Sequence, residues 1–227
     1  MNSLSTHDTP RILNVLSGAP KDMDRYQATN YVLSEEEIKR ATELIKPAVL
    51  LQFFLPGNPC IYYGDEIGMD FAKDIPSKEG GYIRTGARTP MQWSDAKNAG
   101  FTQADEPWFE INTNYTEINV ESEINNPDSI LNYYKKLLRF RKENDIVKYG
   151  DFKMLKTPAK LFAYIRKFEN QKMLVVCSFS EKEMAFRAPD DFDINKAELV
   201  LSNYDDNKNI RNGFLTRPYE TRVYLIK

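Results

Sequence analysis

Residues 34–63 read SEEEIKRATELIKPAVLLQFFLPGNPCIYY and indicate a long helix followed by a short strand. Ser34 supplies a hydroxyl group for the helix N-terminus, and the three glutamates after it lie near the positive end of the helix dipole. One face then repeats at helical spacing, with Ile38, Ala41, Ile45, Ala48, Val49 and Gln52. Pro56 and Gly57 predict the end of this helix. Residues 60–63 predict a short, fully apolar strand.

A first strand is expected near the start of the chain. Residues 3–6 read as the tail of that strand, which places His7 and Asp8 at its carboxyl end. A strand, a helix and a second strand form a β-α-β unit, which is the repeat of a parallel barrel. Functional sites of such barrels lie at the carboxyl ends of the strands, where His7 and Asp8 are expected, although Asp8 could instead cap the turn at Thr9 and Pro10.

A long irregular stretch, residues 70–127, separates this unit from a second expected helix that Asp128 and Ser129 cap. A loop of this length after the last strand of a barrel is usually functional and emerges at the catalytic face. The alternative is a flexible surface insertion. We favour a structured lid or wall, because leaving its aromatic rings in water would be costly. These rings are Tyr82, Trp93, Phe101, Trp108 and Phe109.

The periodicity changes after Gly150, where alternation of side chains replaces helical spacing. Residues 161–168 alternate, and further short strands follow them, which predicts an antiparallel module. The fold class expected is therefore α/β. Residues 1–149 are predicted to form the C-terminal portion of a (β/α)8 barrel. Residues 150–227 are predicted to form a C-terminal all-β domain, a small antiparallel β-sandwich.

Composition argues against several classes of function. The chain has 227 residues, 41% of them hydrophobic, and a net charge of -2 with acids and bases interspersed. We therefore expect no nucleic-acid partner and no membrane partner. Cys60 and Cys177 lack metal-ligand spacing and are expected to be reduced thiols in a cytoplasmic protein. His7 is the sole histidine, which excludes a multi-histidine metal site within these residues.

Three segments, in this order, resemble segments of one enzyme family. Residues 5–11, STHDTPR, resemble the fourth signature segment of the alpha-amylase superfamily of glycoside hydrolases. Residues 56–69, PGNPCIYYGDEIGM, resemble the segment at the eighth strand of its barrel. Residues 84–93, RTGARTPMQW, resemble the arginine-bearing loop of its alpha-glucosidase branch, which includes oligo-1,6-glucosidases. The resemblance covers nearly the whole chain and weakens after about Gly150.

The resemblance implies a retaining hydrolase that acts on alpha-linked gluco-oligosaccharides. This reaction needs a nucleophilic carboxylate and an acid/base carboxyl group about 5 Å apart. Asp8 matches a third carboxylate of the family, the transition-state stabiliser, and His7 matches its sugar-binding neighbour. Arg84 and Arg88 match arginines that bind substrate. Of the two, Arg84 is expected in the pocket, and Arg88 either joins it there or pins the loop through an ion pair.

No stretch of these 227 residues resembles the segments that carry the nucleophile and the acid/base. The resemblance therefore implies that this chain is the C-terminal part of the enzyme and is inactive alone. The alternative is a non-catalytic carbohydrate-binding or assembly fragment. We expect self-association or pairing with a missing N-terminal part. No cofactor or metal is assigned, while calcium dependence, linkage preference and hydrolysis versus transglycosylation stay open.

Three residues within these motifs, Thr6, Asp65 and Glu66, limit the interpretation. Asp65 and Glu66 invite assignment as a catalytic pair, but adjacent residues of a strand or tight turn point in different directions. In the family this segment is structural. Many members carry Asn directly before the His-Asp pair, where this chain has Thr6. One supporting hydrogen bond of the site is therefore in doubt.

Overall fold

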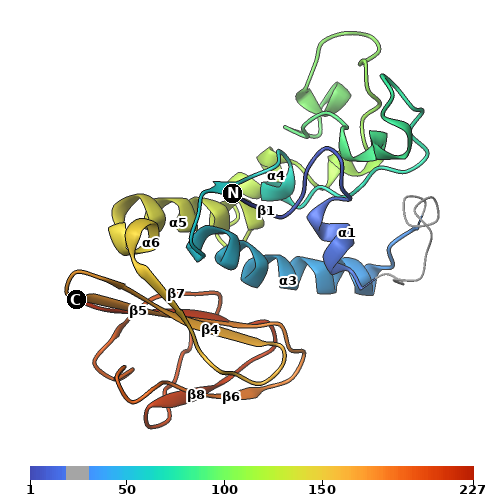
Figure 1. Cartoon of the computed structure of the whole chain (residues 1–227). Helices are drawn as coiled ribbons and strands as arrows, with labels where there is room; N and C mark the ends of the chain where they lie inside the picture. The colour runs from blue at the N-terminus through green and yellow to red at the C-terminus, as the bar shows by residue number, and fades with distance from the viewer. Residues whose placement is uncertain (19–30) are drawn as a thin grey trace. The chain divides into compact units, whose positions relative to one another are not determined.

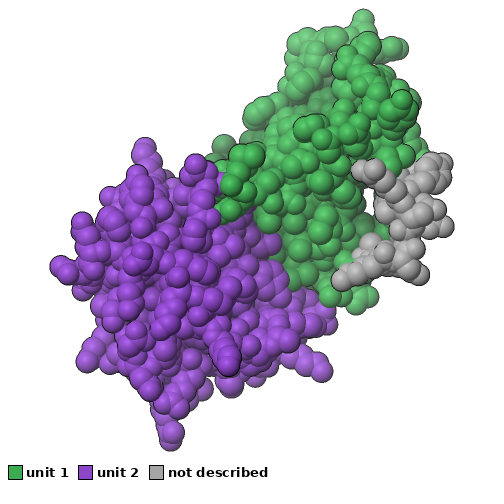
Figure 2. All heavy atoms as spheres, in the orientation of Figure 1, with its two compact units in different colours: residues 1–45, 59–136 green, residues 46–58, 137–227 purple. Residues whose placement is uncertain are grey.

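The computed structural model describes residues 1–18 and 31–227. Contacts between residues divide the chain into two compact units, which are coloured separately in Figure 2. Unit 1 contains residues 1–45 and 59–136, and unit 2 contains residues 46–58 and 137–227. Within the described ranges, no helix is long and apolar enough to cross a bilayer. The boundary predicted at residues 149/150 stays a prediction.

Unit 1 contains a short parallel pair of strands. β1 (Asn2–Ser3) pairs with β2 (Pro59–Cys60), with Asn2 opposite Pro59. The strand predicted over residues 60–63 is thus wrong in extent, since β2 contains only Pro59 and Cys60. The chain then turns, with Asp65 N donating to Tyr62 O at 3.1 Å. The hydroxyl groups of Tyr62 and Tyr63 donate to the carbonyls of Ala87 and Thr89 in the loop that follows.

In the described residues that precede β2, the chain forms the helices α1 (Ile12–Leu16) and α3 (Glu35–Phe54). The predicted start of α3 is confirmed in detail. Glu37 N donates to Ser34 Oγ at 3.2 Å, and Glu37 Oε2 accepts from Ser34 N at 2.8 Å. This reciprocal capping box satisfies two main-chain donors that a helix N-terminus leaves without intrahelical partners.

The stretch from residue 70 to residue 127 is structured, as favoured over a flexible surface insertion. Main-chain bonds from Val120 N to Gln92 O and from Glu121 N to Trp93 O, both 3.0 Å, tie distant parts of it together. It contains short helices rather than only irregular chain: η2 (Tyr82–Ala87), η3 (Lys97–Gly100), η4 (Thr113–Thr116) and α4 (Val120–Ile124), preceded by η1 (Asp65–Ile67). Burial of its aromatic rings does not explain this order, since Tyr82 is 72% and Trp108 65% exposed.

Helix α5 (Ile130–Glu143) confirms the helix predicted after Asp128 and Ser129. A further short helix, α6 (Asp145–Tyr149), follows it and was not predicted. In unit 2, Arg166 lies fully buried near the ends of helices. Its Nη1 donates to the carbonyls of Phe54 and Val147, and its Nε and Nη2 donate to that of Gly150. A cation at helix C-termini interacts favourably with the helix dipole.

The β-strands of unit 2 form two antiparallel sheets (Figure 1). The larger sheet has the order β3-β4-β5-β9-β7, and the smaller pairs β6 with β8. The predicted antiparallel module is confirmed. Its strands are β3 (Asp151–Met154), β4 (Leu161–Phe168), β5 (Gln171–Ser178), β6 (Met184–Arg187), β7 (Glu198–Ser202), β8 (Gly213–Thr216) and β9 (Thr221–Ile226).

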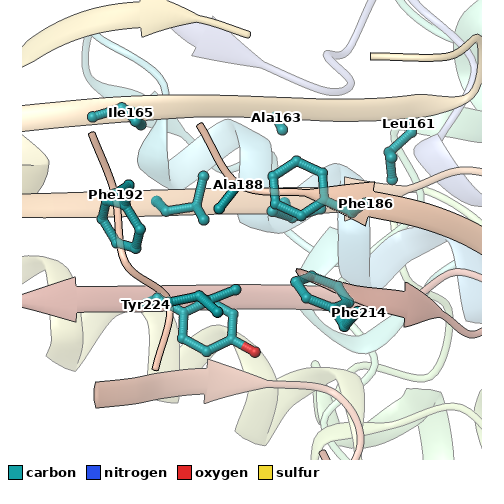
Figure 3. Packing of buried hydrophobic residues seen from close by; sticks show 11 residues of the cluster. Leu161, Ala163, Ile165, Phe186, Ala188, Phe192, Phe214 and Tyr224 are labelled. Carbon is teal, nitrogen blue, oxygen red and sulfur yellow. The ribbon is translucent and has the colours of Figure 1, made fainter. Parts of the chain in front are cut away.

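One hydrophobic cluster joins side chains of both sheets (Figure 3). Leu161, Ala163 and Ile165 alternate along β4 and all face this cluster, as the period of a strand requires. From the smaller sheet, the ring of Phe186 lies 5.3 Å from that of Phe214. Burial of such side chains stabilises each by about 1.5–3 kcal/mol relative to exposure.

Candidate functional site

A turn after β1 holds the two residues of the first motif. Thr9 N donates to Thr6 O at 3.3 Å, and Thr6 N donates to Thr9 Oγ1 at 2.9 Å. Thr6 Oγ1 also accepts from Asp8 N at 3.1 Å. Threonine thus makes a local hydrogen bond at the position where many family members carry asparagine. The turn places the side chains of His7 and Asp8 at the surface of unit 1.

Three cationic or donor groups surround the Asp8 carboxylate. Oδ1 accepts from Arg84 Nη1 at 2.6 Å and from Arg88 Nη2 at 3.1 Å. His7 Nε2 lies 3.1 Å from Oδ2. The structure therefore brings together all four residues that the sequence singled out, although their roles in catalysis and binding stay predictions.

Both arginines are held by main-chain acceptors as well. Arg84, on η2, donates from Nη2 to Gly80 O at 3.3 Å, and Arg88, which follows η2, donates from Nε to His7 O at 3.1 Å. Each guanidinium group therefore links its own loop to the turn that carries Asp8. Arg88 was expected either to bind substrate or to pin its loop through an ion pair. The structure shows that Arg88 forms an ion pair with Asp8, and that Arg84 forms one with the same residue.

The ion pairs orient the carboxylate more than they stabilise the fold. The Asp8 side chain is 48% exposed and that of Arg84 is 35% exposed. Exposed pairs contribute about 0–1 kcal/mol, because water screens them and ordering long side chains costs entropy. An ionised carboxylate has about four acceptor positions. Because the Asp8 side chain is 48% exposed, these neighbours leave part of its capacity to accept hydrogen bonds open to solvent.

A buried polar cluster braces the chain behind this surface site. Ser5 Oγ donates to the carboxylate of Asp65, with 2.7 Å to Oδ1. Arg11 Nη1 lies 3.9 Å from the same oxygen and donates to Tyr63 O. Burial raises the pKa of Asp65 to about 6, while the Ser5 bond and the Arg11 charge act in the opposite direction. These contacts are those of a structural brace, as expected for this segment.

Sequence reasoning assigned no role to Arg11. It is fully buried, and its guanidinium carbon lies 5.0 Å and 4.9 Å from the ring centroids of Tyr62 and Tyr63. This places a cation against two aromatic faces in the interior of unit 1. The sequence did contain a signal for this contact. Arg11 is the last residue of the first motif, residues 5–11, and Tyr62 and Tyr63 belong to the second, residues 56–69.

A hollow of about 500 Å³ adjoins Arg88. Glu66 and Arg88 contribute its charged groups. The rest of its wall is apolar or aromatic, with Tyr63, Pro90, Met91, Trp93, Phe101, Trp108 and Phe109. Four rings of the predicted aromatic wall line this hollow, namely Trp93, Phe101, Trp108 and Phe109, whereas the fifth, Tyr82, is not among its lining residues and is 72% exposed. In the part of the chain described, no cluster of three His, Cys, Asp or Glu residues could hold a metal ion.

Two family models match the chain. The model "Alpha amylase, catalytic domain" matches residues 2–150, and the model "Alpha-amylase SusG C-terminal domain" matches residues 161–223. The first of these covers well over half of the chain. The second falls within the antiparallel module of unit 2. The family relationship thus extends over both the helical part and the β-rich part of the chain.

Curated relatives agree with these models. An oligo-1,6-glucosidase of Bacillus cereus is 38% identical over 82% of this chain and 38% of its own length. A probable oligo-1,6-glucosidase 2 of Bacillus subtilis (strain 168) is 36% identical over 97% of this chain and 41% of its own length. The chain thus spans about two fifths of the length of the relatives that it matches.

Solved structures show the same relationship. The trehalose-6-phosphate hydrolase of Bacillus licheniformis is 32% identical, with a TM-score of 0.72 over 98% of this chain and 42% of its own. The isomaltulose synthase of Protaminobacter rubrum is 28% identical, with a TM-score of 0.75 over the same shares of the two chains. The expected fold class, (β/α)8 barrel structure followed by an antiparallel module, is confirmed. The chain belongs to the alpha-amylase family of glycoside hydrolases.

Proposed function

We propose that this chain supplies part of the active site of a retaining glycoside hydrolase that acts on alpha-linked gluco-oligosaccharides. Asp8 is the transition-state stabiliser in this proposal, and His7, Arg84 and Arg88 bind the sugar beside it. Relatives named oligo-1,6-glucosidase and glucan 1,6-alpha-glucosidase support this substrate class. Since the chain spans about two fifths of the length of the oligo-1,6-glucosidases, the activity of the whole enzyme is part of the proposal.

One observation carries the proposal: two guanidinium groups converge on one carboxylate oxygen at the surface of unit 1. Arg84 lies 76 positions after Asp8 in the sequence, so folding has to bring them together. A planar guanidinium group can hold a carboxylate while its other N–H groups donate to sugar hydroxyls. A fixed carboxylate also stabilises the positive charge that develops on a glucosyl ring during bond cleavage.

We also propose that the 227-residue polypeptide alone has no turnover. Retention needs two carboxyl groups about 5–5.5 Å apart in addition to a stabilising one. Among the described residues, the side-chain partners of Asp8 are His7 and two arginines, and none is a carboxylate. Losing a nucleophile and a general acid together removes most of the covalent and proton-transfer catalysis.

Incubation of the purified chain with a nitrophenyl alpha-glucoside tests this proposal. We expect release of nitrophenol at the rate of the buffer control. Release that is proportional to protein concentration, and that Asp8→Ala abolishes, would contradict inactivity of the isolated chain and locate a complete site within it.

A second candidate function, binding of carbohydrate without catalysis, follows from the same geometry. The partly exposed Asp8 carboxylate and both arginines offer acceptors and donors to sugar hydroxyls without a second carboxylate. Titration with isomaltose, followed by calorimetry, should show weak binding that Asp8→Ala reduces at least tenfold. The control is Asp105→Ala, at a fully exposed aspartate paired with Lys97. Equal affinities of the two variants would remove Asp8 from the binding site.

A further inference from the structure

Two neighbouring tyrosines hold the main chain on either side of Arg88. The hydroxyl group of Tyr62 donates to Ala87 O at 2.9 Å. That of Tyr63 donates to Thr89 O at 2.7 Å. Because Ala87 O belongs to the peptide group that joins Ala87 to Arg88, the first bond fixes the peptide immediately before Arg88. Both flanking residues are fully buried, whereas the Arg88 side chain is 23% exposed. Arg88 thus reaches the surface from a buried main chain that two hydroxyl groups anchor.

Arg11 holds the rings of both tyrosines. Its guanidinium carbon lies 5.0 Å from the ring centroid of Tyr62 and 4.9 Å from that of Tyr63. Arg11 itself is fully buried, and its Nη1 donates to Tyr63 O and lies 3.9 Å from a carboxylate oxygen of Asp65. A cation over an aromatic face is attracted by the ring, more strongly when water is excluded. Arg11 therefore restricts both rings, and with them the direction of their hydroxyl groups.

These contacts lead back to the candidate site. Arg88 Nε donates to His7 O at 3.1 Å, and Arg88 Nη2 donates to Asp8 Oδ1 at 3.1 Å. The segment of residues 5–11 therefore contributes Arg11 to hold the tyrosines and receives Arg88 at His7 and Asp8. A change in the direction of either tyrosine hydroxyl group reaches the Asp8 carboxylate through Arg88.

The Tyr62 hydroxyl group is a lasting donor. Burial raises the pKa of Tyr62 above its usual value of 10.0, and the neighbouring Tyr63 phenol acts in the same direction. A protonated phenol donates a hydrogen bond, and a main-chain carbonyl accepts one. The bond from Tyr62 to Ala87 O therefore does not depend on pH near neutrality.

We propose that Tyr62 and Tyr63 are positioning residues for Arg88, which set the geometry in which Arg88 contacts Asp8 and the sugar beside it. Neither tyrosine needs to touch the sugar for this role. The inference rests on the proposed function, since it names the groups that align an arginine of that site. If the hydroxyl groups only satisfied buried carbonyls, their loss would change stability without changing the site.

His7 supplies a readout of the site that needs no sugar. It is the single histidine of the 227 residues, so its imidazole gives one assignable proton–carbon cross-peak in an NMR spectrum. Because Arg88 donates to His7 O and His7 Nε2 lies 3.1 Å from Asp8 Oδ2, displacement of Arg88 alters the surroundings of this imidazole. We expect Tyr62→Phe to move the cross-peak most, since the Tyr62 hydroxyl group fixes the peptide next to Arg88. Tyr63→Phe should move it less.

Tyr204→Phe is the matched control, in the unit that does not hold the candidate site. The hydroxyl group of Tyr204 donates to Pro218 O at 2.9 Å, and the guanidinium carbon of Arg217 lies 3.9 Å from its ring centroid. This variant should lower the melting temperature about as much as the other two while leaving the His7 cross-peak in place. An equal movement for Tyr204→Phe and Tyr62→Phe overturns the proposal.

Combination with Arg88→Ala shows whether the tyrosines act through Arg88. Residues that act through one another have non-additive effects. Arg88→Ala alone should move the His7 cross-peak, and Tyr62→Phe should move it no further in that background. A second displacement of full size there would mean that Tyr62 does not act through Arg88, and it overturns the proposal.

Titration with isomaltose separates this proposal from the proposed function. Tyr62→Phe should weaken binding roughly threefold to tenfold, the effect of one lost hydrogen bond, and Tyr204→Phe should leave it unchanged. Absence of binding in the wild type, with a His7 cross-peak that Tyr62→Phe still moves, contradicts the sugar-binding role and supports the positioning role. Binding that neither Tyr62→Phe nor Tyr63→Phe changes, with an unmoved His7 cross-peak, supports the site and overturns the positioning role.

Discussion

The two units reach order by different means. Unit 2 is built on long strands, with eight residues in each of β4 and β5, and on a cluster of aliphatic and aromatic side chains. Unit 1 has strands of two residues, and turns, short 3-10 helices and buried polar contacts position its chain. Regular sheets satisfy main-chain groups by themselves, whereas irregular chain needs side-chain partners. In unit 1, the candidate site residues Arg84 and Arg88 are themselves among the side chains that donate to main-chain carbonyls. The same polar side chains can therefore hold the irregular chain and form the candidate site.

Removing Arg166 should produce the largest loss of stability among these variants, because its buried guanidinium group joins several main-chain carbonyls of unit 2. Arg166→Met leaves the carbonyls of Phe54, Val147 and Gly150 without these charged donors in a buried setting. We expect a loss of roughly 3–5 kcal/mol in the free energy of unfolding, measured by urea denaturation with circular dichroism. Arg187→Met is the matched control, since Arg187 is 84% exposed and should change stability by less than about 0.5 kcal/mol. Similar losses for both would show that Arg166 does not tie the unit together.

Asp65 should make the stability of unit 1 depend on pH. Its folded pKa of about 6 lies above the usual value of 3.8, so the native state keeps this proton to a higher pH than the unfolded state does. Its contribution is therefore most favourable below about pH 4 and declines as the pH rises to about 7, by about 3 kcal/mol.

The variant Asp65→Asn should remove this dependence. Its stability relative to the wild type should rise between about pH 4 and about pH 7, as measured by urea midpoints at each pH. Asp105→Asn is the control, because Asp105 is fully exposed and its curve should run parallel to that of the wild type. Parallel curves for Asp65→Asn as well would mean that burial does not raise the pKa of Asp65.

A close backbone contact in unit 1 should give the next effect. A Cβ atom at Gly86 would lie 2.0 Å from Ala72 O and 2.4 Å from the ring of Phe71. Gly86→Ala should therefore cost about 1–3 kcal/mol by overpacking, seen as a lower melting temperature. Gly80→Ala separates this from backbone strain, because its φ is +67° but its nearest neighbour is 4.0 Å away. If Gly80→Ala costs more than Gly86→Ala, backbone strain outweighs steric contact in this loop.

The smallest stability change is expected at the candidate site. Arg84→Ala removes a 2.6 Å ion pair, but both partners are partly exposed, Arg84 by 35% and Asp8 by 48%. We expect a change of about 1 kcal/mol or less in unfolding free energy, together with weaker binding of isomaltose. Lys97→Ala is the control, since it removes another exposed ion pair, the one with Asp105. A loss of several kcal/mol for Arg84→Ala would assign Arg84 to the fold rather than to the site.

Elements with local signals were predicted correctly. The Ser34 and Glu37 pair marks the start of α3, and alternation marks β4, because both signals depend on residues a few positions apart. Strand extent was predicted less well. Tyr62 and Tyr63 have the composition of a strand, yet their hydroxyl groups bond to carbonyls 25 and 26 positions away, and β2 ends before them. Tertiary contacts override local propensity at such positions.

Motifs and patterning in the sequence were enough to predict the family, the two kinds of architecture and the candidate site residues His7, Asp8, Arg84 and Arg88. The folded chain was needed to show that both arginines share one carboxylate oxygen of Asp8, that Arg11 and Arg166 are buried, and that four aromatic rings of the loop line a hollow. Patterning and capping act over a few residues and can be recognised in a linear chain. The convergence of Asp8 and Arg84 joins positions 76 residues apart, and no local pattern specifies such a distance.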